Sequence, residues 1–131
     1  MIPRGIRNNN PGNIRHGEKW QGLAKDQKDE SFCTFETPEY GIRALCKIIK
    51  TYRNKYGLKT VKEIIDRFAP PVENDTKAYI NHVANALDIE PTTEFDLNQD
   101  NLLILIKSII KHENGIQPYS NETIIKGINM S

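Results

Sequence analysis

One acidic side chain lies where a carboxyl group could do acid–base chemistry. Residues 102–110 are apolar on almost every side of a helix, which is typical of a central helix. Leu102, Ile106, Ile109 and Glu113 follow at steps of four, three and four residues, so they share one helical face. At the end of that face a carboxyl group loses hydration and meets the negative end of the helix dipole, and both favour its protonated form. A general acid must be in that form.

The plainer interpretation of Glu113 is a solvated carboxylate at a frayed helix end.

Other kinds of catalytic or metal site find less support in the sequence. His16, His82 and His112 do not share a zinc-binding spacing, and there is no Cys-x-x-Cys motif. Neither a Ser-His-Asp motif nor a phosphate-binding glycine loop is present. We therefore expect no metal and no cofactor.

The elements that must position Glu113 are mainly helices. Helical periodicity begins at residue 37 and continues in five segments, each opened by a side chain that can cap a helix. Gly57 and Gly115 are typical of helix C-termini. The predicted helices are one from Thr37 to Gly57, one from Thr60 with Glu63 to the residue before Pro70, one capped by Asp75 or Asn74 and reaching Leu87, one capped by Asp96 with Gln99 and running from Leu102 to about His112, and one capped by Ser120 or Asn121 and ending near Lys126.

The first 36 residues have a different character. They are rich in glycine, asparagine and charge, and residues 8–13 form a dense turn signal. Residues 20–23 and 32–35 are predicted to pair as a small β-hairpin. The chain is short enough for one domain, 1–131. The sequence thus predicts an α+β fold that is mainly helical, with a small N-terminal β-hairpin.

Charge and hydropathy restrict the partners. Eighteen Lys+Arg against seventeen Asp+Glu give a net charge of +1, which argues against a nucleic-acid partner. No apolar run reaches the roughly 18 residues of a membrane span, and the N-terminal residues lack the apolar core of a signal peptide. We expect a monomer made in the cytoplasm without a signal peptide.

Several segments resemble muralytic enzymes. Residues 109–115 (IIKHENG) resemble the segment that carries the catalytic acid in lysozyme-like lytic transglycosylases and glucosaminidases. Residues 9–15 (NNPGNIR), 20–22 (WQG), 32–35 (FCTF) and 41–44 (GIRA) resemble phage virion-associated and prophage proteins, and more distantly flagellar-type glucosaminidases. In ordinary members the glutamate helix precedes the hairpin, whereas here it follows. The resemblance therefore implies a circularly permuted lysozyme-like domain, a rearrangement that is tolerated when the termini lie close together.

A further segment, 69–80 (APPVENDTKAYI), is similar to one in soluble lytic transglycosylases. In those enzymes a Glu-Thr pair precedes a tyrosine that lines the sugar groove. Thr76 and Tyr79 match this spacing, but Asp75 replaces the glutamate and Glu73 lies two residues earlier. Which of the two acids matters is left open.

The resemblance implies cleavage of the β-1,4 glycan strand of peptidoglycan, with Glu113 as catalytic acid. One glutamate can act first as acid and then as base while the muramyl 6-hydroxyl closes an anhydro ring. A hydrolase would need a second carboxylate, for which Glu18, Asp29, Glu30 and Glu36 are the candidates. A solvated surface is the plainer interpretation of those four. The single-glutamate mechanism is therefore favoured.

Five side chains are candidates for binding the glycan: Tyr79, Asn13, Trp20, Tyr119 and Thr76. Asn13 could bind the N-acetyl group or position Glu113. Each of the five has a plainer role, such as core packing for the aromatic residues and turn formation for Asn13. The enzyme would act at the periplasm or cell wall, as an endolysin or as part of a virion. The alternatives are a non-catalytic virion structural or wall-binding module, and a helical partner-binding domain with an uncovered apolar face.

Overall fold

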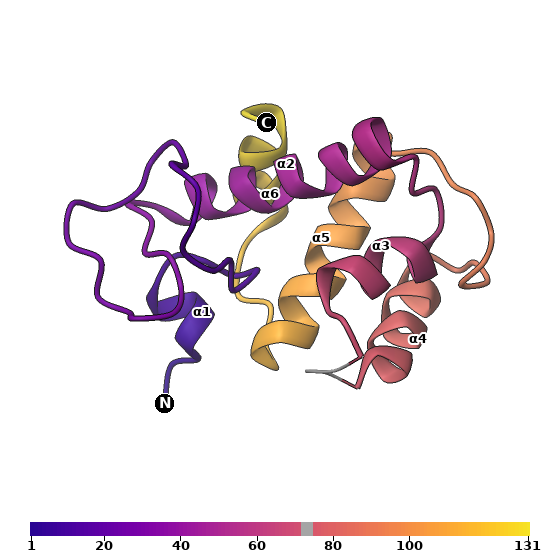
Figure 1. Ribbon diagram of the computed structural model, residues 1–131, viewed down its shortest axis with the longest axis horizontal. Coiled ribbons are helices and arrows are strands. Elements are labelled where there is room, and N and C mark those ends of the chain that lie inside the picture. The colour runs from indigo at the N-terminus through magenta and orange to yellow at the C-terminus, as the bar shows by residue number, and fades with distance from the viewer. Residues whose placement is uncertain (72–74) are drawn as a thin grey trace.

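The computed structural model describes residues 1–71 and 75–131, and Glu73 and Asn74 lie outside this part of the chain. The fold is mainly helical, as predicted (Figure 1). No helix in the described ranges is long and apolar enough to cross a membrane. The described helices are α1 (Arg4–Arg7), α2 (Pro38–Tyr56), α3 (Val61–Phe68), α4 (Thr76–Ala86), α5 (Gln99–Asn114) and α6 (Asn121–Asn129).

Local capping signals explain where most helices begin. In four helices the capping side chain accepts a hydrogen bond from the backbone N–H three residues later, as an N-cap does. These predicted caps are Thr37 at α2, Thr60 at α3, Asp75 at α4 and Ser120 at α6.

The start of α5 differs from the prediction. Asn98 directly precedes the helix, and its Oδ1 accepts from the backbone N–H of Asn101 at 2.9 Å. Asp96 lies too far upstream to cap, and its carbonyl oxygen instead accepts from the Asn101 side chain at 2.8 Å. Helix α1 was not predicted, because four residues are too short to leave a periodic signal. Helix α6 extends to Asn129, beyond the predicted end near Lys126.

The predicted β-hairpin between residues 20–23 and 32–35 is reduced to one antiparallel bridge, Leu23–Phe35, and no strand forms in this part of the chain. Between residues 14 and 36 the backbone forms two isolated antiparallel bridges, Arg15–Phe32 and Leu23–Phe35, in place of strands. Backbone hydrogen bonds beside the Leu23–Phe35 bridge run from Ala24 N–H to the Thr34 carbonyl and from Glu36 N–H to the Gly22 carbonyl, and side chains supply the others. The Gln27 amide binds both backbone groups of Thr34, and the Asp29 carboxylate accepts from the backbone N–H of Phe32.

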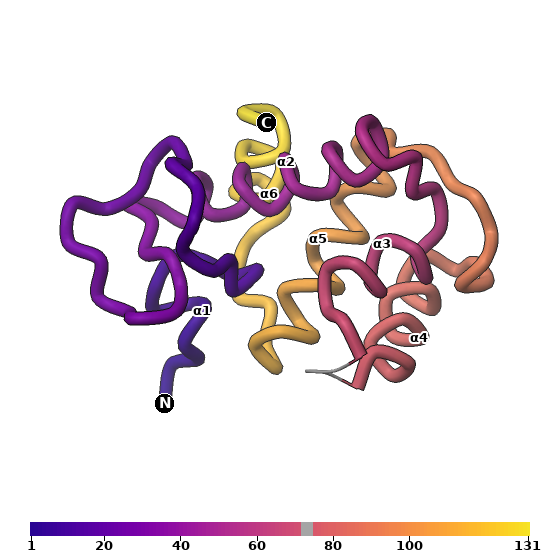
Figure 2. Tube along the Cα trace, viewed as in Figure 1, coloured from indigo at the N-terminus to yellow at the C-terminus, as the bar shows by residue number. Residues whose placement is uncertain are grey.

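Helices α2 and α5 connect two parts of the molecule. Figures 1 and 2 show residues 1–36 on one side and α3 with α4 on the other, with α2 and α5 between them. Four residues of α5 are fully buried, which confirms its central place in the core. They are Leu105, Ile106, Ile109 and Ile110. Below, residues 1–36 are called the N-terminal lobe and α3 with α4 the helical lobe.

An ion pair fixes α1 within the N-terminal lobe. The Arg4 guanidinium donates two hydrogen bonds to the Asp29 carboxylate, which also accepts from the backbone N–H groups of Ser31 and Phe32 and from the Asn8 amide. These donors, with Arg4 contributing most, lower the pKa of Asp29 far below its usual range. Asp29 therefore has a structural role and is not free to act as a second acid.

The Asp29 ion pair predicts a pH dependence of stability. A carboxyl whose pKa is lower in the folded state stabilises the fold above its unfolded pKa, and this contribution is lost as the pH falls through the folded pKa. Replacing Asp29 by Asn should therefore lower the Tm at pH 7, and the difference from the wild type should shrink below about pH 4. Thermal unfolding followed by circular dichroism from pH 7 to pH 3 measures this. Asp26→Asn, at an exposed site in the same lobe, is the matched control. A Tm difference independent of pH would contradict the prediction.

Candidate active site

Glu113 lies in the last turn of α5 and is half-buried. Gly115 ends the helix with φ at 76°, a left-handed conformation that suits glycine. The Glu113 Oε1 atom accepts a hydrogen bond from Asn13 Nδ2 at 2.9 Å, which joins residues 100 positions apart. Asn13 itself has a left-handed backbone, with φ at 51°. The N-terminal lobe thus holds the carboxylate at the end of the central helix.

The side chains of Tyr79 and His112 stack on each other next to Glu113, between α4 and α5. Tyr79 of α4 is 1% exposed, and its ring stacks on His112 with 3.9 Å between the ring centroids. Burial, together with the nearby negative charge of Glu113, raises the pKa of Tyr79 well above its usual range. His112 Nδ1 lies 3.0 Å from His82 Nδ1. Burial and His82 lower the pKa of His112, against a smaller opposite effect of Glu113 and Asp75. The His112 imidazole is therefore disposed to stay neutral.

Two predicted sugar-binding residues are wrong in that role. The Tyr79 ring is enclosed by α4 and α5, so it has no face free to stack on a sugar. Thr76 is 5% exposed, and its hydroxyl donates to the carbonyl oxygen of Ala69 at 2.6 Å. Tyr79 therefore packs in the core against His112, and Thr76 joins the start of α4 to Ala69.

Two asparagine amides have their orientation fixed at the junction of α1 and α5. Asn114 Nδ2 donates to the carbonyl oxygens of Pro11 and Ile110, both at 2.9 Å, while Asn13 Nδ2 donates to Glu113. Each amide oxygen is therefore turned away from these acceptors, and both are buried without a partner in the described residues. Both oxygens face Gly5, where a Cβ would lie 2.5 Å from Asn114 Oδ1 and 2.7 Å from Asn13 Oδ1. Only a residue without a side chain fits here.

The Gly5→Ala variant should disturb the candidate site directly. The new methyl group would also lie 2.9 Å from the carbonyl oxygen of Asn10, so α1 or the asparagines must shift. Overpacking of this kind typically costs about 1–3 kcal/mol. The Tm measured by thermal unfolding should therefore fall. The control is Arg7→Ala, at an exposed position of the same helix. Wild-type stability in Gly5→Ala would contradict the close packing.

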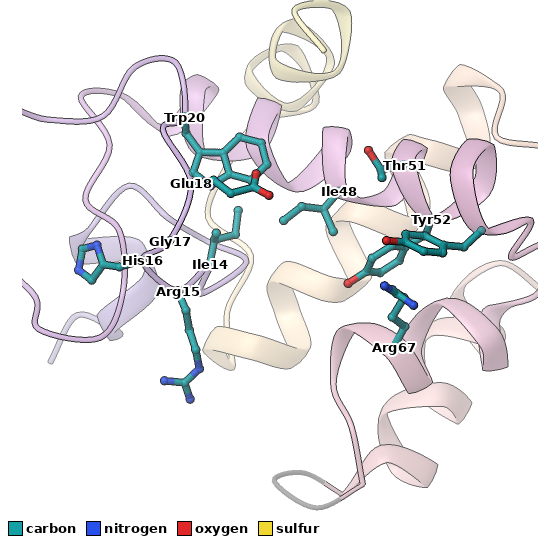
Figure 3. A pocket seen from close by; sticks show the side chains of 11 residues that line it. Ile14, Arg15, His16, Gly17, Glu18, Trp20, Ile48, Thr51, Tyr52 and Arg67 are labelled. Carbon is teal, nitrogen blue, oxygen red and sulfur yellow. The ribbon is translucent and has the colours of Figure 1, made fainter.

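A groove runs between the two lobes beside Glu113. A cavity of about 280 Å³ is lined by Glu113 and Asn13, and by Phe68 at the end of α3. It continues into a second cavity of about 640 Å³ (Figure 3). The two share their walls at four residues, Ile14, Arg15, Ile48 and Tyr52. Among the residues that the structure describes, Glu113 is the only carboxylate lining the smaller cavity.

The other predicted residues divide into two groups. Trp20 and Glu18 line the larger cavity, and Figure 3 shows both on the side of the N-terminal lobe. Glu30 and Glu36 are exposed and line neither cavity. Tyr119 also lies outside both linings, and burial, with a smaller effect of Glu39, raises its pKa to about 12. Of the four candidate second acids, only Glu18 lies in the groove.

Sequence reasoning missed the side of the groove formed by α2 and α3. Tyr52 and Tyr56 are one helical turn apart on α2, and Arg67 of α3 lies against them. The i, i+4 spacing of the two tyrosines is the signal that marks a shared face. Arg67 carries no such signal, because its contact with α2 depends on tertiary packing.

The fold and the groove define a mainly helical protein with a half-buried glutamate between two lobes. No known family model matches the chain. The chain is 44% identical over 128 residues to Protein P5 of Pseudoalteromonas phage PM2, and the match covers 95% of this chain and 79% of that protein. The chain therefore belongs to the same family as this phage protein.

Proposed function

We propose that the protein is a peptidoglycan-cleaving glycosidase of the lysozyme-like kind, with Glu113 as its general acid and base. The observation that carries the proposal is the half-buried carboxylate of Glu113, oriented by Asn13 in a groove between two lobes. A central helix that ends in this glutamate is consistent with a circularly permuted lysozyme-like fold. The kinship with a phage protein fits an enzyme directed at a bacterial wall.

The hydrogen bonding of Glu113 suggests how one glutamate would serve twice. Because Asn13 donates to Oε1, the acidic proton belongs on Oε2, from which it passes to the oxygen of the scissile β-1,4 bond. The resulting carboxylate then takes the proton of the muramyl 6-hydroxyl, which attacks the anomeric carbon and closes a 1,6-anhydro ring. The lack of a second carboxylate among the described residues of the smaller cavity favours this route over hydrolysis.

The site of action follows from the substrate. Peptidoglycan lies outside the cytoplasmic membrane, so the protein would act at the periplasm or cell wall after synthesis in the host cytoplasm. It would reach the wall as an endolysin or as a component of the virion, and a monomer suffices because both lobes of the groove come from one chain.

Digestion of purified sacculi tests the proposal. Soluble muropeptides identified by mass spectrometry are the expected result, with masses lower by one water molecule than the hydrated products. Full-mass products with a new reducing end would support hydrolysis and direct attention to Glu18. Binding of sacculi without any released fragment would overturn the enzymatic proposal in favour of a non-catalytic wall-binding or virion module.

A further inference from the structure

Arg67 presents an ordered positive charge to the groove. Its guanidinium carbon lies 3.7 Å from the ring centroid of Tyr56 and 5.4 Å from that of Tyr52. Stacking of this kind holds a guanidinium in place without occupying its N–H donors. The described residues place no carboxylate in ion-pair contact with Arg67. The charge is therefore positioned but not neutralised.

The position of Arg67 connects it to the candidate active site. Arg67 lines the larger cavity, while the next residue, Phe68, lines the smaller cavity with Glu113. Figure 3 shows Arg67 beside Tyr52, across the cavity from Glu18 and Trp20. A strand lying over Glu113 would thus bring its substituents to Arg67 without leaving the groove.

The charges around the larger cavity favour an anion at Arg67. Glu18 is the one carboxylate among its described lining residues and belongs to the opposite lobe, whereas Arg15 adds a second guanidinium. Arg15 lies over the Phe32 ring, 5.0 Å from its centroid. A carboxylate matches the planar fork of a guanidinium and can accept two hydrogen bonds from it.

We infer that Arg67, with Tyr52 and Tyr56, forms a subsite for a carboxylate of the peptide that substitutes each muramic acid residue. This inference rests on the proposed function, since it assumes a peptidoglycan strand in the groove. In a peptide-bearing strand the lactyl group is an amide, so the negative charges belong to the peptide. The sugars fill the groove at Glu113, and the peptide turns towards α3.

Binding of a defined ligand tests the subsite without requiring cleavage. The probe is a peptide-bearing glycan tetrasaccharide, titrated by calorimetry into Glu113→Gln protein so that it stays intact. The matched ligand is the same molecule with its peptide carboxylates converted to primary amides. Arg67→Gln, introduced into the Glu113→Gln protein, should weaken binding of the charged ligand about tenfold, because one charge-assisted hydrogen-bonded contact is lost. Binding of the amidated ligand should not change.

Control variants separate a specific contact from a general effect. Arg7→Gln removes the same charge from an exposed position of α1 and should leave both affinities unchanged. Equal weakening of both ligands by Arg67→Gln, no weakening, or no measurable binding of the charged ligand would each overturn the subsite. Charge-selective binding by a protein that never cuts sacculi would refute the proposed activity but retain the subsite. Cleavage of sacculi without charge-selective binding would support the proposed activity but refute the subsite.

Discussion

Replacing Glu113 by Gln is expected to abolish most peptidoglycan cleavage while leaving the fold intact. General acid–base catalysis typically contributes roughly 10²–10⁴-fold to a rate, and here one side chain would serve both steps. Glutamine keeps the shape of the residue, and its amide oxygen can still accept the hydrogen bond from Asn13 Nδ2. Rates of muropeptide release from sacculi, with thermal unfolding measured on the same protein, provide the test.

Two other glutamates make this experiment specific. Glu36→Gln removes a carboxylate from an exposed site outside the groove and should cut at the wild-type rate. Glu18→Gln removes the acid that lines the larger cavity. A loss in Glu18→Gln as large as in Glu113→Gln would indicate a two-carboxylate hydrolase. A Glu113→Gln protein that folds and cuts normally would exclude Glu113 as the acid.

Helix positions follow from local signals in this sequence. Thr37 followed by proline, and Thr60 with Glu63, place a capping oxygen next to helical periodicity, and the structure has both helices where they are predicted. The N-terminal lobe could not be predicted in the same way. There, the side chains of Gln27 and Asp29 compete for backbone groups, and the β-prone residues around them do not form strands.

The candidate site was only partly predictable for a similar reason. The spacing of residues along α5 places Glu113 at the end of a buried face, which is a local property of one helix. A contact between Asn13 and Glu113 was one of the roles open to Asn13, but the sequence could not decide it, because it depends on how the N-terminal lobe packs against α5. Tyr79 illustrates the limit, because its helical position is evident but its complete burial against His112 is set by the packing of α4 on α5.

The second large effect is expected in Asn10→Ala, where the free energy of unfolding should fall by roughly 3 kcal/mol or more. Asn10 is fully buried, and its Nδ2 donates to the carbonyl oxygens of Ile14 and Cys33 while its Oδ1 accepts from the backbone N–H of Ile14, each at 2.9 Å. Alanine removes these three hydrogen bonds to the backbone. The Ile14 N–H and the Cys33 carbonyl then lose their partner, at about 1–3 kcal/mol for each buried group, whereas the Ile14 carbonyl still accepts from the backbone N–H of Cys33. Urea unfolding followed by circular dichroism measures the loss, with the exposed Asn81→Ala as control.

A second substitution separates hydrogen bonding by Asn10 from simple space filling. Asn10→Asp keeps the side-chain volume and one acceptor, but it replaces the NH₂ donor with an oxygen facing two carbonyl oxygens. If the amide holds the lobe together through its donor, Asp should destabilise at least as much as Ala, because its second oxygen would be buried against two carbonyl oxygens with no donor. A mild Asp variant beside a severe Ala variant would mean that volume matters more.

The same substitutions should affect the candidate site. Since the backbone N–H of Asn13 donates to the carbonyl oxygen of Asn10, loosening Asn10 should also release Asn13 from Glu113. Cleavage should then fall at temperatures where the helices are still folded.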